Sequence, residues 1–510
     1  MFLDTTIGNI TEPVSGRQWG RQTILAQIDA RSRRYHHEGI RAGDRVFLHF
    51  GNRLEFFADL LAIWRLGACA IPVDSRLTTF EVDKLIRVAT PRVALVDEHV
   101  DSPVTQCLSA SNVKVLNTTE IALHEGSKAD GMFSGNHPRL DDEALILFTS
   151  GSTGQPKGVV HTHRSLLARW ITLQQSLGLR PHRRTLCMLP THFGHGLICN
   201  CLFPWLSGQD LFITPPFSTE LITQLGALID EHKITFLSSV PSIWRLALKL
   251  ARPPSQNTLE RVHCGSAPLS AYLWRDVQAW ASVRDVYNAY GITETGSWVA
   301  GTTGADFVPE DGLIGRGWGA VIKILHTPSP HAPFARDMEC KPNESGYVWI
   351  NTPALMKEYL HREDLTNQVV CQGWFMTGDI GILDETGRLY LKGRERDEIN
   401  KGGMKVYPAD VEAVVEQFSQ TDDVCVFGFD DFLYGQDIGM GIVLKDGSPA
   451  TVGALYHWMK TRLAGHKMPK RWYLMDAIPR TSRGKVNRTN VMERCAELEA
   501  VDLQKLLDQA

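Results

Sequence analysis

Residues 149–158, Thr-Ser-Gly-Ser-Thr-Gly-Gln-Pro-Lys-Gly, limit most strongly how this chain can fold. They follow an apolar run at residues 144–148, which predicts a buried strand, and they precede Val159 and Val160. Glycines let successive backbone N–H groups point the same way and form a nest for an anion. The Ser and Thr hydroxyls add donors, and Lys157 adds a positive charge. The segment therefore predicts a polyphosphate-binding loop directly after a buried strand.

This loop is not a Walker A loop, because Gly-x-x-x-x-Gly-Lys-Ser/Thr does not occur in it. Taken alone, a run of small polar residues is also compatible with a flexible surface loop. Motifs elsewhere in the sequence distinguish a polyphosphate-binding loop from a flexible surface loop.

Strand-like and helix-like segments alternate on both sides of the loop. Before it, residues 45–50, 68–72 and 93–96 read as strands, and residues 54–66 and 81–89 as helices. After it, helices are expected at 163–177, 196–206, 219–232 and 241–251, with strands at 185–189, 211–213, 235–237, 261–264 and 285–287. This alternation predicts an α/β fold with two doubly wound, mostly parallel sheets.

The pattern changes towards the C-terminus. Residues 312–390 have short strands and Gly/Pro turns, which predict a small β-barrel-like subdomain. A charged stretch at residues 392–397 marks a boundary, and a compact α+β unit follows it. We therefore expect a large N-terminal domain at residues 1–394 and a small mobile C-terminal domain at residues 395–510.

Composition excludes several classes of protein. The chain has 510 residues, 43% hydrophobic and 22% charged, and a net charge of −4, so neither nucleic acid nor a membrane surface is an expected partner. Ten scattered cysteines are too few for a disulfide scaffold, and we read them as reduced thiols. We find no signal peptide and no membrane span, and we expect a cytoplasmic protein that is a monomer or a homodimer.

Four further motifs carry polar side chains that suit chemistry. They are Cys264-Gly265-Ser266-Ala267-Pro268, Asn288-Ala289-Tyr290-Gly291-Ile292-Thr293-Glu294, Thr377-Gly378-Asp379 and Pro479-Arg480-Thr481-Ser482-Arg483-Gly484-Lys485. Each has a plain structural alternative: a strand–helix turn, a helix cap, a turn between strands and a solvated basic loop, respectively. Together with residues 149–158 they form an ordered set.

This set, in this order, resembles the adenylate-forming superfamily of acyl-CoA synthetases, aryl-CoA ligases, peptide-synthetase adenylation domains and luciferases. The resemblance covers essentially the whole chain. It implies that ATP binds residues Thr149, Ser150, Gly151, Ser152, Thr153, Gly154, Lys157, Gly265, Ser266, Ala267, Pro268, Asn288, Ala289, Tyr290, Gly291, Thr293, Glu294, Asp379, Arg394 and Lys485.

The resemblance also implies individual roles. The catalytic residues would be Lys485, Glu294 and Thr149. Lys485 would bridge the acid and the α-phosphate, and Glu294 would hold Mg²⁺, which prefers hard oxygen ligands. Asp379 and Arg394 would contact the ribose.

A mobile C-terminal domain is part of the same resemblance. The domain would rotate about a hinge at Arg396, where the family usually has Asp or Lys. Gly402, Gly403 and Lys405 would then line the tunnel for the thiol.

Substrate choice is less well specified. Residues 190–196 match the family segment loosely, with Phe193 where that pattern has His. We expect an acyl pocket formed by Phe193, His195, Cys199, Val240 and Trp298. The absence of a carboxylate in this segment argues against α-amino acids.

The resemblance predicts an ATP-dependent acid–thiol ligase that uses CoA. The alternative is a stand-alone adenylating enzyme that loads the phosphopantetheine of a carrier protein. Another acceptor, such as oxygen, an amine or a hydroxyl, and a non-catalytic nucleotide-binding regulator also stay open.

Overall fold

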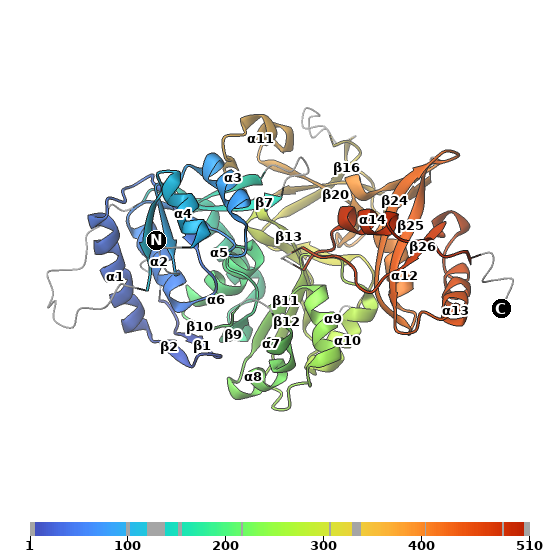
Figure 1. Ribbon diagram of the computed structural model, residues 1–510, viewed down its shortest axis with the longest axis horizontal. Helices are drawn as coiled ribbons and strands as arrows, with labels where there is room; N and C mark the ends of the chain where they lie inside the picture. The colour runs from blue at the N-terminus through green and yellow to red at the C-terminus, as the bar shows by residue number, and fades with distance from the viewer. Residues whose placement is uncertain are drawn as a thin grey trace.

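The computed structural model describes residues 6–97, 102–119, 138–150, 156–215, 218–304, 308–328, 338–402, 404–481 and 484–503. Its N-terminal part holds two large sheets, and its C-terminal part a smaller sheet with its own helices (Figure 1). No helix in these ranges is long and apolar enough to cross a membrane.

The first sheet has seven strands in the order β18-β8-β7-β4-β3-β5-β6. Its strands are β3 (Arg45–His49), β4 (Cys69–Pro72), β5 (Val93–Val96), β6 (Lys114–Asn117), β7 (Glu143–Ser150), β8 (Pro156–Thr162) and β18 (Glu358–Tyr359). Strands β7, β4, β3, β5 and β6 run parallel, as predicted. Strand β8 returns antiparallel to β7, so the two strands flank residues 151–155.

Helices cover both faces of this sheet. Helices α1 (Arg21–His37) and α2 (Leu54–Arg65) share a core with Val46 and Leu48, whereas α3 (Thr79–Ala89) and α4 (Pro103–Ala110) share another with Phe47. Every residue of α2 is buried, which explains why its sequence is apolar on nearly all sides. The sheet is therefore doubly wound.

The second sheet has 14 strands. Its parallel part consists of β13 (Val286–Ile292), β12 (Arg261–Gly265), β11 (Phe236–Ser239), β9 (Arg184–Cys187), β10 (Asp210–Ile213) and β1 (Ile10–Glu12), with β2 (Arg17–Trp19) antiparallel at the edge. Its helices are α5 (His163–Leu177), η2 (Arg180–His182), η3 (His195–Leu202), α6 (Phe203–Trp205), α7 (Thr219–Thr223), α8 (Leu225–Glu231), α9 (Pro241–Leu250) and α10 (Ala271–Ala281).

The short strands predicted between residues 312 and 390 continue this sheet. They are β15 (Leu313–Gly317), β16 (Val321–Leu325), β17 (Gly346–Asn351), β19 (Val370–Cys371), β20 (Trp374–Leu383) and β21 (Leu389–Arg394), with α11 (Glu363–Val369) beside them; β14 (Ser297–Gly301), which was not predicted, precedes them. They pair antiparallel, and β14 connects them to β13.

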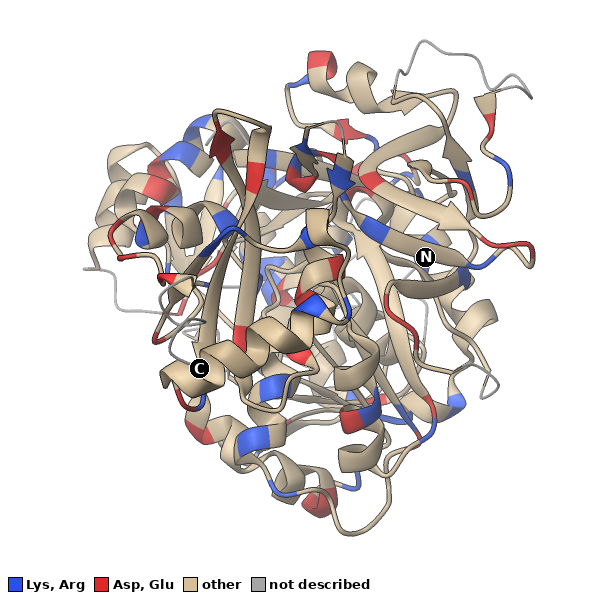
Figure 2. Ribbon diagram, turned by 90° about the vertical axis from the view of Figure 1, so that its right-hand side faces the viewer, with Lys and Arg blue, Asp and Glu red and all other residues tan. Residues whose placement is uncertain are grey.

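The C-terminal part has a five-stranded sheet and a separate apolar core. Its elements are η6 (Glu395–Asp397), β22 (Ile399–Lys401), β23 (Met404–Val406), α12 (Pro408–Glu416), β24 (Thr421–Asp431), β25 (Gly435–Leu444), α13 (Pro449–Lys460), η7 (Gly465–Lys467), β26 (Arg471–Leu474) and α14 (Arg488–Ala496). Basic and acidic residues are interspersed over this part, in keeping with the small net charge (Figure 2).

Several local predictions were wrong. Thr377-Gly378-Asp379 lies within the continuous strand β20 and not in a turn, because β21 pairs along it and a bulge near Ile380 absorbs the irregularity. The helix expected at residues 219–232 is divided into α7 and α8. The helix expected at residues 196–206 is present, and its residues 195–202 have π-helical geometry.

Candidate nucleotide and acid site

Asp379 is the centre of a buried polar cluster at the junction of three strands. Antiparallel pairing of β20 with β21 places it opposite Arg394, and the Arg394 Nε lies 2.6 Å from the Asp379 Oδ1. Tyr290, on β13, donates its hydroxyl hydrogen bond to the other carboxylate oxygen. Burial raises the pKa of the Asp379 carboxyl, and Arg394 opposes that rise. The cluster holds a buried carboxylate acceptor on β20, which pairs with strands on both of its sides.

Glu294 forms a second cluster beside the ends of β7 and β8. The Tyr359 hydroxyl donates to the Glu294 Oε1 at 2.7 Å, and the Lys157 Nζ lies 5.4 Å from the centre of the Tyr359 ring. Thr149 is the register partner of Lys157. The carboxylate, the lysine and the start of the glycine-rich segment therefore lie together.

Two close backbone approaches shape the space between these clusters. Gly265 pairs with Ala289, and a Cβ at Gly265 would lie 2.2 Å from the Ala289 carbonyl oxygen. A Cβ at Gly291 would lie 1.9 Å from the Ser297 carbonyl oxygen. Only glycine fits at either position, so the fold itself requires a glycine at residues 265 and 291. Ser266, Ala267 and Pro268 follow β12 directly. The Asn288 side chain donates to the Leu313 carbonyl oxygen at 2.7 Å.

His195 opens η3 and is buried, with a serine hydroxyl at each ring nitrogen. Ser266 Oγ lies 2.9 Å from its Nδ1, and Ser238 Oγ lies 2.6 Å from its Nε2. Burial lowers the pKa of His195 to about 3, and Lys485 adds to that lowering. The imidazole is therefore neutral, with one donor and one acceptor nitrogen.

Lys485 lies on a tight loop of the C-terminal part that approaches the N-terminal part. The Thr481 N–H donates to the Lys485 carbonyl oxygen at 2.7 Å, and the Gly484 N–H donates to the Thr481 carbonyl oxygen at 2.9 Å. A Cβ at Gly484 would lie 2.7 Å from Ser242 Oγ. Lys485 acts electrostatically on both His195 and Asp379, so the loop faces the site.

Ion pairs between the two parts support this arrangement. Arg245 on α9 pairs with Glu416 on α12, and the Lys249 Nζ lies 2.9 Å from the Asp422 Oδ1. Lys485 thus faces the strand ends of the larger sheet while these contacts are made.

The residues expected to form the acyl pocket lie on η3 or close to it. The Phe193 and His195 rings lie 5.7 Å apart, and His195 lies 5.1 Å from the Trp298 ring. The backbone N–H of Trp298 donates to the Cys199 sulfur at 3.3 Å. Val240 is buried under the Lys485 loop, since its Cγ2 lies 3.2 Å from a Cβ built at Gly484.

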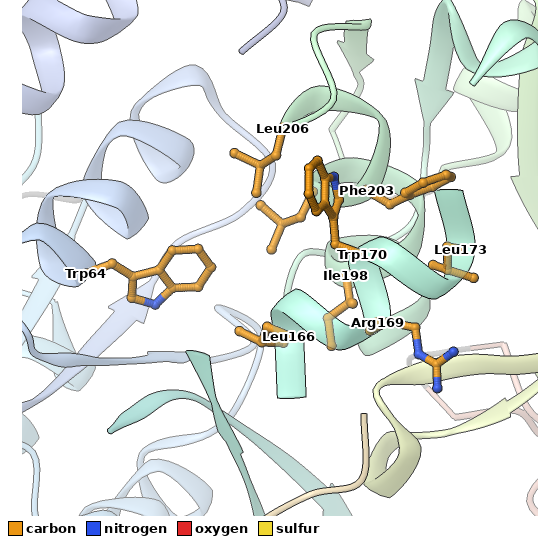
Figure 3. A pocket seen from close by; sticks show the side chains of 9 residues that line it. Trp64, Leu166, Arg169, Trp170, Leu173, Ile198, Phe203 and Leu206 are labelled. Atoms are coloured by element: carbon orange, nitrogen blue, oxygen red, sulfur yellow. The ribbon is translucent and has the colours of Figure 1, made fainter. Parts of the chain in front are cut away.

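The other side of η3 faces a small apolar cavity (Figure 3). Ile198 and Phe203 line it together with Trp64 from α2 and Trp170 from α5. This cavity is separate from the His195 side of the π-helix.

Some predicted residues lie elsewhere. Gly402 contacts Tyr434 and Lys405 pairs with Glu398, so their contacts are within the C-terminal part. Arg396 lies in η6 with its side chain 68% exposed. Gly151, Ser152, Thr153, Gly154 and Gly403, and the side chain of Ser150, lie outside the described residues.

Sequence reasoning missed Tyr359. It reaches Glu294 because β18 pairs with β8, and no local motif marks a lone tyrosine that acts through a long-range strand pairing. It also missed a surface group of His326, Cys340 and Glu344, whose possible metal-ligand atoms lie within 4.8 Å of one another. All ten cysteines are free thiols.

Comparison with known proteins agrees with this geometry. Residues 15–360 match the family model described as AMP-binding enzyme, and residues 410–485 match the model of the AMP-binding enzyme C-terminal domain. The chain is 29% identical over 472 residues to the long-chain-fatty-acid–CoA ligase FadD13 of Mycobacterium tuberculosis, covering 89% of each chain. It is 28% identical over 485 residues to the oxalate–CoA ligase of Arabidopsis thaliana, covering 92% of this chain and 91% of that protein.

Solved structures share the fold. ATP-bound MatB from Rhodopseudomonas palustris superposes with a TM-score of 0.82 at 24% identity, covering 96% of both chains. The anthranilate CoA ligase AuaEII with anthranoyl-AMP gives a TM-score of 0.84 at 21% identity, covering 96% of this chain and 94% of that one. The order of the motifs, the two-part architecture and the matched family models together place this chain in the family of AMP-binding enzymes.

Proposed function

We propose that this protein is an ATP-dependent carboxylate–CoA ligase. A carboxylate is a poor electrophile, so the first step joins it to the α-phosphate of ATP and releases pyrophosphate. The CoA thiol then attacks the acyl carbon, and AMP leaves as the thioester forms. The family and the relatives that are CoA ligases support this reaction.

The position of Lys485 carries the proposal. Its charge acts on Asp379, the expected ribose contact, and on His195, the expected wall of the acid pocket. A cation between those two places can stabilise the negative charge that develops at the α-phosphate. We assign Lys485 that role in acyl-AMP formation.

The remaining polar groups fit a bound nucleotide. Asp379 can accept from ribose hydroxyls, with Arg394 holding its charge. Gly265, Ser266 and Tyr290 line the place we assign to adenine, and Thr149 and Lys157 the place for phosphates. The Glu294 carboxylate, steadied by Tyr359, is a hard oxygen ligand beside them and suits Mg²⁺, which would neutralise phosphate charge.

Transfer to the thiol needs a second arrangement of the same residues. We propose that residues 395–510 rotate about Arg396 as a mobile domain relative to residues 1–394. Lys485 would then leave the site, and Gly402, Gly403 and Lys405 would line the path of the pantetheine arm.

The test is carboxylate-dependent release of pyrophosphate from ATP over a panel of acids, with and without CoA. We expect acid-dependent release alone and thioester formation only when CoA is added. Thioester formation with a holo-carrier protein but not with CoA would replace CoA by the phosphopantetheine arm. Absence of pyrophosphate release with every acid would contradict the proposal.

A further inference from the structure

His263, at the centre of β12, is completely buried, and neither of its ring nitrogens has a hydrogen-bond partner among the described residues. Five aromatic rings surround it, including the His182 imidazole at 6.3 Å. The Tyr287 and Trp318 rings are stacked on it at 5.4 and 5.7 Å, and the Trp298 and Phe236 rings lie at 4.6 and 4.9 Å. A buried polar group without a partner destabilises the fold, so its retention calls for a reason.

The position of His263 relative to His195 and Lys485 suggests such a reason. Trp298 contacts both His195 and His263, so the two histidines are one indole ring apart. Ser238, which bonds to His195, is the register partner of His263 on the neighbouring strand. His195 is the histidine that Lys485 faces, and His263 is therefore one step deeper along the same face of the sheet.

The chemistry of this deeper position is specific. Burial lowers the pKa of His263 well below its ordinary value, so the imidazole is neutral and offers one donor and one acceptor. The indole N–H groups of Trp298 and Trp318 also lack partners in the part of the chain that the structure describes. Gly301 makes room for Trp318, since a Cβ there would lie 2.2 Å from the Trp318 Cζ2. The region around His263 thus combines aromatic ring faces with N–H and N groups that have no hydrogen-bond partner among the described residues.

We propose that the acid substrate is a compact aromatic acid with a hydroxyl or amino group opposite its carboxylate, and that His263 binds that group. This inference rests on the proposed function. The carboxylate lies towards Lys485 and His195, the substrate ring lies against the aromatic side chains, and the polar substituent satisfies the imidazole. A long alkyl chain would pass the same residues and leave every one of these polar atoms unpaired.

The experiment compares 4-hydroxybenzoate, 4-aminobenzoate, benzoate and decanoate in acid-dependent pyrophosphate release. It uses the unmodified protein, His263→Phe and His163→Phe. His163 is the matched control: it is also buried with both ring nitrogens unpartnered in the described chain, but it packs on Trp64, away from the site. Thermal unfolding of both variants checks that they fold.

We expect the unmodified protein to prefer a substituted benzoate over benzoate by about 10- to 100-fold in kcat/KM. His263→Phe should bring that ratio to within about threefold by losing activity on the substituted acids only, and His163→Phe should keep it.

Preference for decanoate over every benzoate would overturn this inference and leave the ligase proposal intact. An unchanged ratio in His263→Phe would also overturn it. Absence of activity with every acid, including a broader panel, would contradict the proposed function itself and this inference with it. If a variant does not fold, the acid panel on the unmodified protein still tests the predicted preference for substituted benzoates.

Discussion

The Asp379 carboxylate shows how single residues define this site. It is 4% exposed, yet Arg394 and Tyr290 each pair with one of its oxygens, and its backbone N–H donates to the Thr377 hydroxyl at 3.0 Å. Such a carboxylate is a fixed, charged acceptor and suits a pair of vicinal hydroxyls.

Asp379→Asn should raise the KM for ATP by about 10- to 100-fold, because an amide loses charge-assisted hydrogen bonding. Initial rates at varied ATP measure this. Asp364→Asn is the control, because Asp364 also pairs with an arginine but its side chain is exposed. Equal KM values for both variants would contradict the role of Asp379.

Buried histidines give a prediction on pH. Burial lowers the pKa of His161 and His163 to about 4 and of His182 and His195 to about 3, all below the ordinary value of 6.5. The unfolded chain therefore binds more protons below pH 6.5, and stability falls as the pH drops from there towards 4. Each such histidine contributes about 1.4 kcal/mol per pH unit to that loss.

Urea unfolding at pH 7, 6, 5 and 4.5 measures the effect. His163→Phe removes one titrating group, so its stability should fall less steeply than that of the unmodified protein. Identical slopes for the two proteins would contradict the assignment of His163 as a neutral buried group.

At the scale of elements, the loop before α14 is the one that brings Lys485 to the site. Gly484 has φ +76, and a side chain there would meet Ser242 and Val240 at the start of α9. Gly484→Ala should therefore push the loop outwards and slow acyl-AMP formation by about 10-fold or more.

Gly453→Ala, in α13 of the same part, is the matched control. A Cβ at Gly453 meets nothing within 4 Å, so this change should leave the rate unchanged and raise stability slightly. Pyrophosphate exchange measures both variants. A Gly484→Ala protein as fast as the control would mean that the loop does not approach α9 as described.

The parallel strands and the C-terminal unit could be predicted from the sequence, because periodicity and glycine placement are local signals. The sequence did not predict that Asp379 lies inside a strand, since the irregularity at Gly378 is a bulge in the pairing of β20 with β17. It missed Tyr359 for the same reason: strand β18 meets β8 about 200 positions earlier in the chain. Long-range pairing, not residue type, determined these parts of the site.

At the scale of the whole molecule, the proposed reaction needs two arrangements of one C-terminal part. The described arrangement has Lys485 facing the site and Arg245–Glu416 and Lys249–Asp422 closing the contact. We propose that it is the arrangement in which acyl-AMP forms.

Arg396→Pro should restrict the proposed hinge, because proline fixes φ and limits the residue before it. We expect nearly normal acyl-AMP formation and impaired thioester formation. Arg396→Ala, which keeps backbone freedom, should behave like the unmodified protein. Equal loss of both half-reactions in Arg396→Pro would contradict the hinge.

The most direct test of the account separates the two half-reactions in Lys485→Ala. Acid-dependent exchange of pyrophosphate into ATP reports the first, and conversion of supplied acyl-AMP by CoA reports the second. The account predicts loss of the first by about 100-fold or more, with the second nearly unchanged. A first half-reaction at full rate, or an equal loss of both, would contradict it.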